Sequence, residues 1–144
     1  MKIDIINGPN LNLLGAREPE KYGNMTFSDY LEKMRSFFPD TDFDYFQSNV
    51  EGEIINRLHS AAGSYDGVIL NAGGYTHTSV AIHDANSSVA IPVVEVHITN
   101  IYAREEFRHK SLISSNCKGT ISGFGLDSYR LAAEALKEIV KSNK

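Results

Sequence analysis

The chain has 144 residues, which is the length of one domain and enough to bury a hydrophobic core without disulfides or metals. A (β/α)₈ barrel within one chain needs roughly 250 residues and is excluded. The composition is 42% hydrophobic and 22% charged, as in ordinary globular domains, and the formal net charge is −4. Because no run of lysine and arginine stands out, neither nucleic acid nor an anionic membrane is expected as the main partner.

Targeting and redox signals point to an ordinary intracellular domain. Cys117 is the only cysteine, so no internal disulfide can form and a Cys-x-x-Cys metal motif is absent. The first ten residues place Lys2 and Asp4 in a short apolar run, which is unlike a signal peptide. No stretch of ~18 consecutive apolar residues occurs. We therefore expect a cytoplasmic protein that forms a single domain over residues 1–144.

The first half of the chain alternates strand-length and helix-length segments. Residues 2–7 (KIDIIN) predict a strand that ends at Gly8-Pro9. Residues 26–38 carry apolar side chains at helical spacing, Thr26 and Asp29 resemble a capping box, and Pro39 ends the segment. Residues 42–47 (DFDYFQ) alternate as in a half-buried edge strand, and residues 51–62 again have helical period.

The second half continues the same alternation. Residues 67–70 (GVIL) predict a buried strand, 79–88 a helix, 90–96 a second buried strand and 100–107 a short helix. Residues 119–122 are a weaker strand, and 126–140 form the last helix. Short connections between alternating strands and helices predict an α/β fold with helices on both faces of a parallel sheet. Five strands at this spacing indicate the flavodoxin-like doubly wound order.

Polar side chains collect where three of the predicted strands end. In a doubly wound sheet, ligands bind outside the carboxyl ends of the strands, near the point where the strand order reverses. The residues that follow the first, third and fourth predicted strands are therefore expected at one edge: Asn10, Asn12, Arg17, Tyr22, Asn71, Gly73, Gly74, His77, Glu95, His97, Thr99 and Arg108. This convergence of segments far apart in sequence predicts a binding site.

Several of these residues also have an ordinary structural interpretation. Asn10 and Asn71 are equally well explained as turn formers, because asparagine bonds its own backbone at strand ends. Gly73-Gly74 fits a tight turn as well as a close approach to a ligand. Tyr22, in a polar loop, is more often a surface aromatic than a functional group.

Glu95 and His97 carry the clearest chemical signal. At positions i and i+2 of a strand, their side chains share one face of the sheet. A carboxylate beside an imidazole favours the protonated ring, which is what a general acid near neutral pH requires. The alternative is a structural pair in the core.

The sequence lacks the usual motifs for binding a metal ion or a nucleotide. The histidines lack the HxxxH spacing, and nearby carboxylates do not form a ligand pattern. Residues 119–125 (GTISGFG) contain neither GxGxxG nor GxxxxGK[ST]. A phospho-receiver domain would require acidic residues at the ends of the first and third strands, where this chain has asparagine.

Three blocks of the chain resemble the type II 3-dehydroquinate dehydratases. Residues 7–23 (NGPNLNLLGAREPEKYG) are similar to the family signature, and residues 71–79 (NAGGYTHTS) and 95–108 (EVHITNIYAREEFR) resemble its other two blocks. The resemblance extends from the first strand to the last helix, whereas Tyr75, Lys110 and residues 114–118 are less typical. It implies a flavodoxin-like, cofactor-free hydro-lyase that assembles from trimers into a homododecamer.

The resemblance also implies roles in the anti elimination of water from 3-dehydroquinate, through an enolate, to 3-dehydroshikimate. Tyr22 would remove the proton next to the ketone, and Arg17 would hold that tyrosine as phenolate. Favouring a phenolate by two pKa units takes about 2.7 kcal/mol, and a guanidinium at ~4 Å supplies about 4 kcal/mol at a dielectric of ~20. Asn10 would steady the enolate, and His97, oriented by Glu95, would protonate the departing hydroxyl.

The remaining residues implied by the resemblance bind the substrate. Its hydroxyls and carboxylate would contact Asn71, Gly73, Gly74, His77, Asp84, Ile98, Thr99 and Arg108. Arg108 suits the carboxylate because its planar fork can bind both oxygens. Residues 15–23 are expected to form a lid. Alternatives are a non-catalytic module that binds small anions or polyols and, more remotely, a phosphate-ester hydrolase.

Overall fold

A computed structural model describes residues 1–16, 20 and 24–143 of the chain. Its sheet consists of β1 (Lys2–Asn7), β2 (Asp42–Gln47), β3 (Gly67–Asn71), β4 (Val93–His97) and β5 (Gly119–Ser122). The strands are all parallel and lie in the order β2-β1-β3-β4-β5. The predicted α/β class, the parallel pairing, the edge position of β2 and the doubly wound order are confirmed.

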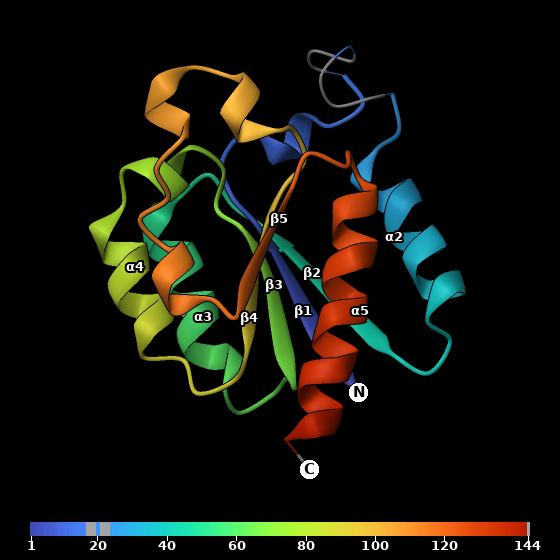
Figure 1. Ribbon diagram of the computed structural model, residues 1–144. Coiled ribbons are helices and arrows are strands. Elements are labelled where there is room, and N and C mark those ends of the chain that lie inside the picture. The colour runs from blue at the N-terminus through green and yellow to red at the C-terminus, as the bar shows by residue number, and fades with distance from the viewer. Residues whose placement is uncertain (17–19, 21–23, 144) are drawn as a thin grey trace.

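In the part of the chain that the structure describes, helices cover both faces of the sheet (Figure 1). Helices α2 (Phe27–Phe37) and α5 (Asp127–Ser142) pack on one face, and α3 (Glu51–Ala61) and α4 (Val80–Ser87) on the other. The predicted start of α2 is confirmed, since the Thr26 hydroxyl accepts a hydrogen bond from the Asp29 amide. Ser79 caps α4 in the same way at Ile82, with a distance of 2.9 Å. None of the helices in the described ranges is long and apolar enough to cross a membrane.

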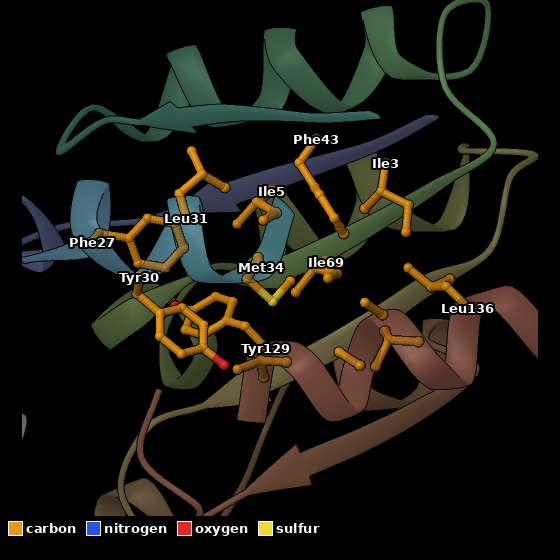
Figure 2. Packing of buried hydrophobic residues seen from close by; sticks show 14 of the residues in the cluster. Ile3, Ile5, Phe27, Tyr30, Leu31, Met34, Phe43, Ile69, Tyr129 and Leu136 are labelled. Carbon is orange, nitrogen blue, oxygen red and sulfur yellow. The ribbon is translucent and has the colours of Figure 1, made fainter. Parts of the chain in front are cut away.

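The alternation of side chains along the strands divides the core into two layers. Ile3, Ile5 and Ile69 point toward α2 and α5, where they pack with Met34 and Tyr129 (Figure 2). The opposite layer, toward α3 and α4, contains Ile6, Val68, Leu70 and Val93. Glu95 and His97 follow Val93 at intervals of two, so both belong to the α3/α4 face, at the carboxyl end of β4.

Two predicted elements differ from the structure. The helix expected over 100–107 is instead two short 3₁₀ turns, η3 (Ile101–Ala103) and η4 (Glu106–Arg108). Arg104 and Glu105 between them are extended, with ψ of −164° and 147°, which interrupts any continuous helix. Strand β4 begins at Val93 rather than at residue 90, because Pro92 has no amide hydrogen for a sheet.

Candidate active site

A cavity opens at the carboxyl edge of the sheet, where the segments after β1, β3 and β4 meet. In Figure 1 these segments gather at the top of the molecule. The cavity is lined by Pro9, Asn10, Leu11, Leu13, Leu14, Asn71, Gly73, Gly74, His77, His97, Ile98, Thr99, Ile101, Arg104 and Arg108. As predicted, the segments after these three strands meet, and the cavity is lined by eight of the residues expected there: Asn10, Asn71, Gly73, Gly74, His77, His97, Thr99 and Arg108. Asn12 does not line it.

The two loops after β1 and β3 are pressed together by glycines. A Cβ atom on Gly8 would lie 2.5 Å from the carbonyl oxygen of Ala72, which no side chain could tolerate. Gly73 has a φ of +60°, and a Cβ there would approach the Pro9 carbonyl at 3.1 Å. Glycine at position 73 therefore serves the tight turn and the packing of one loop on the other. At Gly74 a Cβ would meet open space.

Glu95 and His97 form a buried pair behind the cavity. The Glu95 side chain is 0% exposed and that of His97 is 6% exposed. The carboxylate oxygen Oε2 is hydrogen-bonded to His97 Nε2. Because Nε2 is held there, Nδ1 is the ring nitrogen left for a molecule in the cavity. The pair combines a proton donor at the site with a buried negative charge behind it.

His77 lies beside His97 but has a different environment. The two rings are stacked with centroids 6.2 Å apart. Nδ1 of His77 lies 2.8 Å from the Lys110 carbonyl, which can only accept, so Nδ1 carries the hydrogen. Burial lowers the pKa of His77, and the charges of His97 and Arg108 add to this effect. A neutral His77 therefore presents Nε2 as an acceptor for a ligand hydroxyl.

Asn71 serves the loop as well as the cavity. Its Oδ1 accepts from the Gly73 amide at 3.1 Å, which confirms the predicted turn-forming role. Its Nδ2 donates to the Tyr129 hydroxyl at 2.9 Å, and that hydroxyl in turn donates to Asn7 at 2.8 Å. One N–H of the Asn71 amide is left for a ligand.

Asn10 is both a turn residue and part of the cavity lining. Its φ of 70° places the backbone in the left-handed region, which asparagine tolerates better than most residues. The Asn10 amide donates to Asn49 Oδ1 at 2.9 Å, which anchors the loop after β1 to the loop after β2. The side chain does not cap the following 3₁₀ turn η1 (Leu11–Leu13).

Among the described residues, two arginines from the segment after β4 line the cavity. Arg108 holds Glu105 through Nε at 2.5 Å and stacks over Phe107, which leaves its terminal nitrogens for an anion. Arg104 Nη1 donates to Thr99 Oγ1 at 3.4 Å and also lines the cavity. Sequence reasoning missed Arg104, although its position four residues before Arg108 in the same block was a usable signal.

Among the described residues, two of the predicted site residues do not line this cavity: Glu95, which lies behind it, and Asp84. Asp84 lies on α4 with its side chain 72% exposed, paired with His83 at 3.0 Å, and does not line the cavity. Arg17 and Tyr22, together with most of the expected lid, lie outside the described residues. Within the described ranges, no group of three His, Cys, Asp or Glu side chains is arranged to hold a metal ion.

Known proteins share this sequence and fold over nearly the full length. The family model for class II dehydroquinase matches residues 1–137. A 3-dehydroquinate dehydratase from Caldicellulosiruptor bescii is 54% identical over 142 residues, covering 96% of this chain and 98% of the relative. The corresponding Pelodictyon phaeoclathratiforme protein is 53% identical over 138 residues, covering 94% and 91%.

Solved structures agree with the sequence comparison. The crystal structure of a type II dehydroquinase from Butyrivibrio crossotus superposes with a TM-score of 0.91 at 43% identity, covering 95% of this chain and 97% of that one. The type II dehydroquinase from Propionibacterium acnes gives a TM-score of 0.88 at 38% identity, covering 97% and 96%. This chain therefore belongs to the class II dehydroquinase family.

Proposed function

We propose that this chain is a hydro-lyase that converts 3-dehydroquinate to 3-dehydroshikimate, a step of the shikimate pathway that leads to aromatic amino acids. Family membership over residues 1–137 supports the activity. The observation that carries the chemistry is the Glu95–His97 pair, buried behind a cavity that also contains Arg108. A module that only bound small anions would have no use for such a proton donor.

The elimination begins with loss of a proton from the carbon next to the ketone. We assign this step to Tyr22 as phenolate with Arg17 as its cationic partner, an assignment that rests on the family signature in residues 7–23. The electron pair of the broken C–H bond moves into the ketone and forms an enolate. Asn10, on the cavity wall, is suited to stabilise the enolate oxygen, through a bridging water where the distance requires it.

The second step expels the hydroxyl group on the opposite side of the ring. The enolate re-forms the carbonyl, the electron pair moves into the new carbon–carbon double bond, and the C–O bond breaks. His97 donates the proton on Nδ1 to the departing hydroxyl, which leaves as water. The hydrogen on Nε2 stays on the ring and remains hydrogen-bonded to Glu95. The negative charge of Glu95 stabilises the imidazolium before transfer and keeps the ring in one orientation.

The cavity offers partners for each polar group of the substrate. Arg108 is the best candidate for the carboxylate, because its terminal nitrogens form a planar fork. His77 and the free N–H of Asn71 suit ring hydroxyls. The backbone of Ile98 and Thr99 and the turn at Gly73 and Gly74 also line the cavity and complete the proposed binding set.

We further propose that the protein works in the cytoplasm as a homododecamer built from trimers. The position of Asp84 supports self-association. The family resemblance predicts that Asp84 contacts substrate, but its exposed side chain does not line the cavity of its own chain. In such an assembly, the predicted contact of Asp84 with substrate is made in the site of a neighbouring copy. Sedimentation of a monomer at micromolar concentration would contradict the assembly.

A direct assay tests the activity. Purified protein is mixed with 3-dehydroquinate, without added cofactor, and the conjugated enone of the product is followed by its ultraviolet absorbance. We expect turnover that survives excess chelator, and survival after borohydride treatment with substrate, because no lysine imine is formed. Absence of enone formation would overturn the proposed function.

A further inference from the structure

The buried carboxylate of Glu95 has more partners than His97. Its second oxygen, Oε1, is surrounded by three hydroxyl groups, which we call the hydroxyl cluster: Ser111, Ser114 and Thr120. The Ser114 hydroxyl lies 2.5 Å from Oε1 and that of Ser111 lies 3.1 Å away. The Thr120 hydroxyl is more distant, at 3.5 Å, and also lies 3.4 Å from the Ser114 hydroxyl.

The backbone determines the direction of the Ser111 hydrogen bond. Ser111 Oγ accepts from the amides of Ile113, at 3.2 Å, and Ser114, at 3.1 Å. With its lone pairs used in this way, the hydroxyl hydrogen is free to donate to Glu95. Hydrogen bonds to an ionised acceptor are stronger than those between neutral groups. Oε1 is thus held by oriented donors that favour the carboxylate over the neutral acid.

The serines belong to a segment that is fastened to the rest of the site. Residues 109–118 follow Arg108 directly and lead to β5. The Leu112 amide donates to the Thr76 carbonyl at 2.8 Å, and Ile113 is fully buried in the α3/α4 layer. The Lys110 carbonyl in the same segment orients His77. One segment therefore positions the partners of two cavity histidines.

We propose that Ser111 and Ser114 are positioning residues for the elimination: they hold Glu95 charged and oriented, so that its other oxygen keeps His97 ready as the acid. Thr120 contributes less because it is farther away. This inference rests on the proposed role of His97. It adds two residues that lie outside the three blocks of family resemblance and do not line the cavity.

The balance of charges around Glu95 agrees with this proposal. Burial raises the pKa of Glu95, but the hydrogen bonds from His97, Ser114 and Ser111 together bring it below its ordinary value. Among the described residues, His77 and Cys117 also interact with Glu95, whose charge favours a protonated His77 and a neutral thiol. Burial raises the pKa of Cys117 to about 12, so the thiol stays neutral in the working pH range.

The test compares Ser111→Ala, Ser114→Ala and the double variant with Ser115→Ala as a matched control. Ser115 is exposed in the same segment and is not part of the hydroxyl cluster. Loss of hydrogen bonds to a charged group predicts that kcat of the double variant falls by about 10- to 100-fold. KM should stay within a few-fold, because neither serine lines the cavity. Ser114→Thr, which keeps the hydroxyl, should recover most of the kcat lost in Ser114→Ala.

The pH dependence separates positioning from a general structural defect. With the donors removed, Glu95 binds its proton more readily, so the acid limb of the kcat profile moves to higher pH. Carboxyl-carbon NMR of the substrate-free protein, assigned with Glu95→Gln, should show a rise of about one unit or more in the Glu95 pKa. The single variants are measured alongside, so that the test survives misfolding of the double variant.

The outcomes distinguish this inference from the proposed function. A raised Glu95 pKa with lowered kcat and an unchanged Ser115→Ala control supports the positioning role. A Glu95 pKa that is unchanged in Ser114→Ala and Ser111→Ala overturns it, even if kcat falls. If the unaltered protein does not convert 3-dehydroquinate, the proposed function fails, whereas the NMR result still decides whether the hydroxyl cluster holds the charge of Glu95.

Discussion

Asp4 and Glu95 are two fully buried carboxylates on the α3/α4 face of the sheet, and their partners give them different roles. Asp4, on β1, accepts two hydrogen bonds from Arg57. Nε donates to Oδ2 at 2.7 Å, and Nη2 donates to Oδ1 at 2.8 Å. Glu95, on β4, is bound by His97 and the serine hydroxyls. Both side chains are 0% exposed. Burial alone therefore does not identify a functional acid.

The partners make the difference between the two pairs. Arg57 does not give up its proton, and it is held further by the hydroxyl of Tyr65, at 3.0 Å, and by the ring of Phe46. Burial raises the pKa of Asp4, an effect that Arg57 offsets only in part. The His97 imidazole, unlike a guanidinium, is a group that can transfer a proton, and it lies on the wall of the cavity. The Asp4–Arg57 pair is thus a structural clamp, and the Glu95–His97 pair is a candidate for catalysis.

Removing the acid from the second pair should have one of the largest effects. His97→Ala leaves no ring nitrogen to protonate the departing hydroxyl, so we expect kcat to fall by about 10²- to 10⁴-fold. The variant also leaves the buried Glu95 carboxylate without its ring partner, so we expect a loss of thermal stability as well, and kcat is compared per folded molecule. Steady-state kinetics and thermal unfolding measure the two effects. A kcat within a few-fold of the parent would exclude His97 as the acid.

The base should be equally sensitive. Tyr22→Phe removes only a phenolic oxygen, and we expect a loss of about 10²- to 10⁴-fold in kcat, measured by steady-state kinetics, with normal folding.

The stereochemistry of the elimination tests whether the base and the acid act on opposite faces of the substrate. It can be followed with deuterium at the carbon next to the ketone. Anti loss of the label agrees with Tyr22 and His97 acting from opposite faces, whereas syn loss contradicts this arrangement.

Breaking the Asp4–Arg57 pair should lower the free energy of unfolding and leave kcat unchanged. Arg57→Leu leaves Asp4 buried without its cation, and breaking a buried pair in this way costs roughly 3–5 kcal/mol. Chemical denaturation measures this loss, and kcat per folded molecule should be unchanged. A variant that remained as stable as the parent, or one that lost turnover while folded, would show that the two pairs are not divided as we describe.

Changing Arg108, the proposed partner of the substrate carboxylate, should have a smaller effect, and it should appear in KM. Arg108→Lys keeps the charge but loses the planar fork, so we expect KM to rise by about tenfold or more. The Glu105 carboxylate, now bound to Arg108, would face an ammonium instead. The KM for 3-dehydroquinate is the quantity to compare, and an unchanged value would show that the substrate carboxylate is bound elsewhere.

The same two pairs show what could be predicted from the sequence. Strands β1 and β3 were predictable because apolar runs that end at asparagine or glycine are local signals, and Glu95 and His97 followed from their spacing within one strand. The hydroxyl cluster was not predictable in this way, because Ser114 reaches Glu95 across 19 residues through the path of the segment after η4. Likewise, the extended backbone at Arg104 that divides the expected helix at 100–107 has no local sequence signature.

The comparison is tested most directly by neutralising each buried carboxylate without changing its size. Glu95→Gln removes the charge that holds His97 as an acid, and we expect kcat for 3-dehydroquinate to fall by about 10²-fold. Asp4→Asn removes a charge of equal burial on the same face, and kcat per folded molecule should stay within about twofold, as expected for a site outside the chemistry. A Glu95→Gln variant with full turnover, or an Asp4→Asn variant with an equal loss while folded, would contradict the assignment of Glu95 and His97 to catalysis.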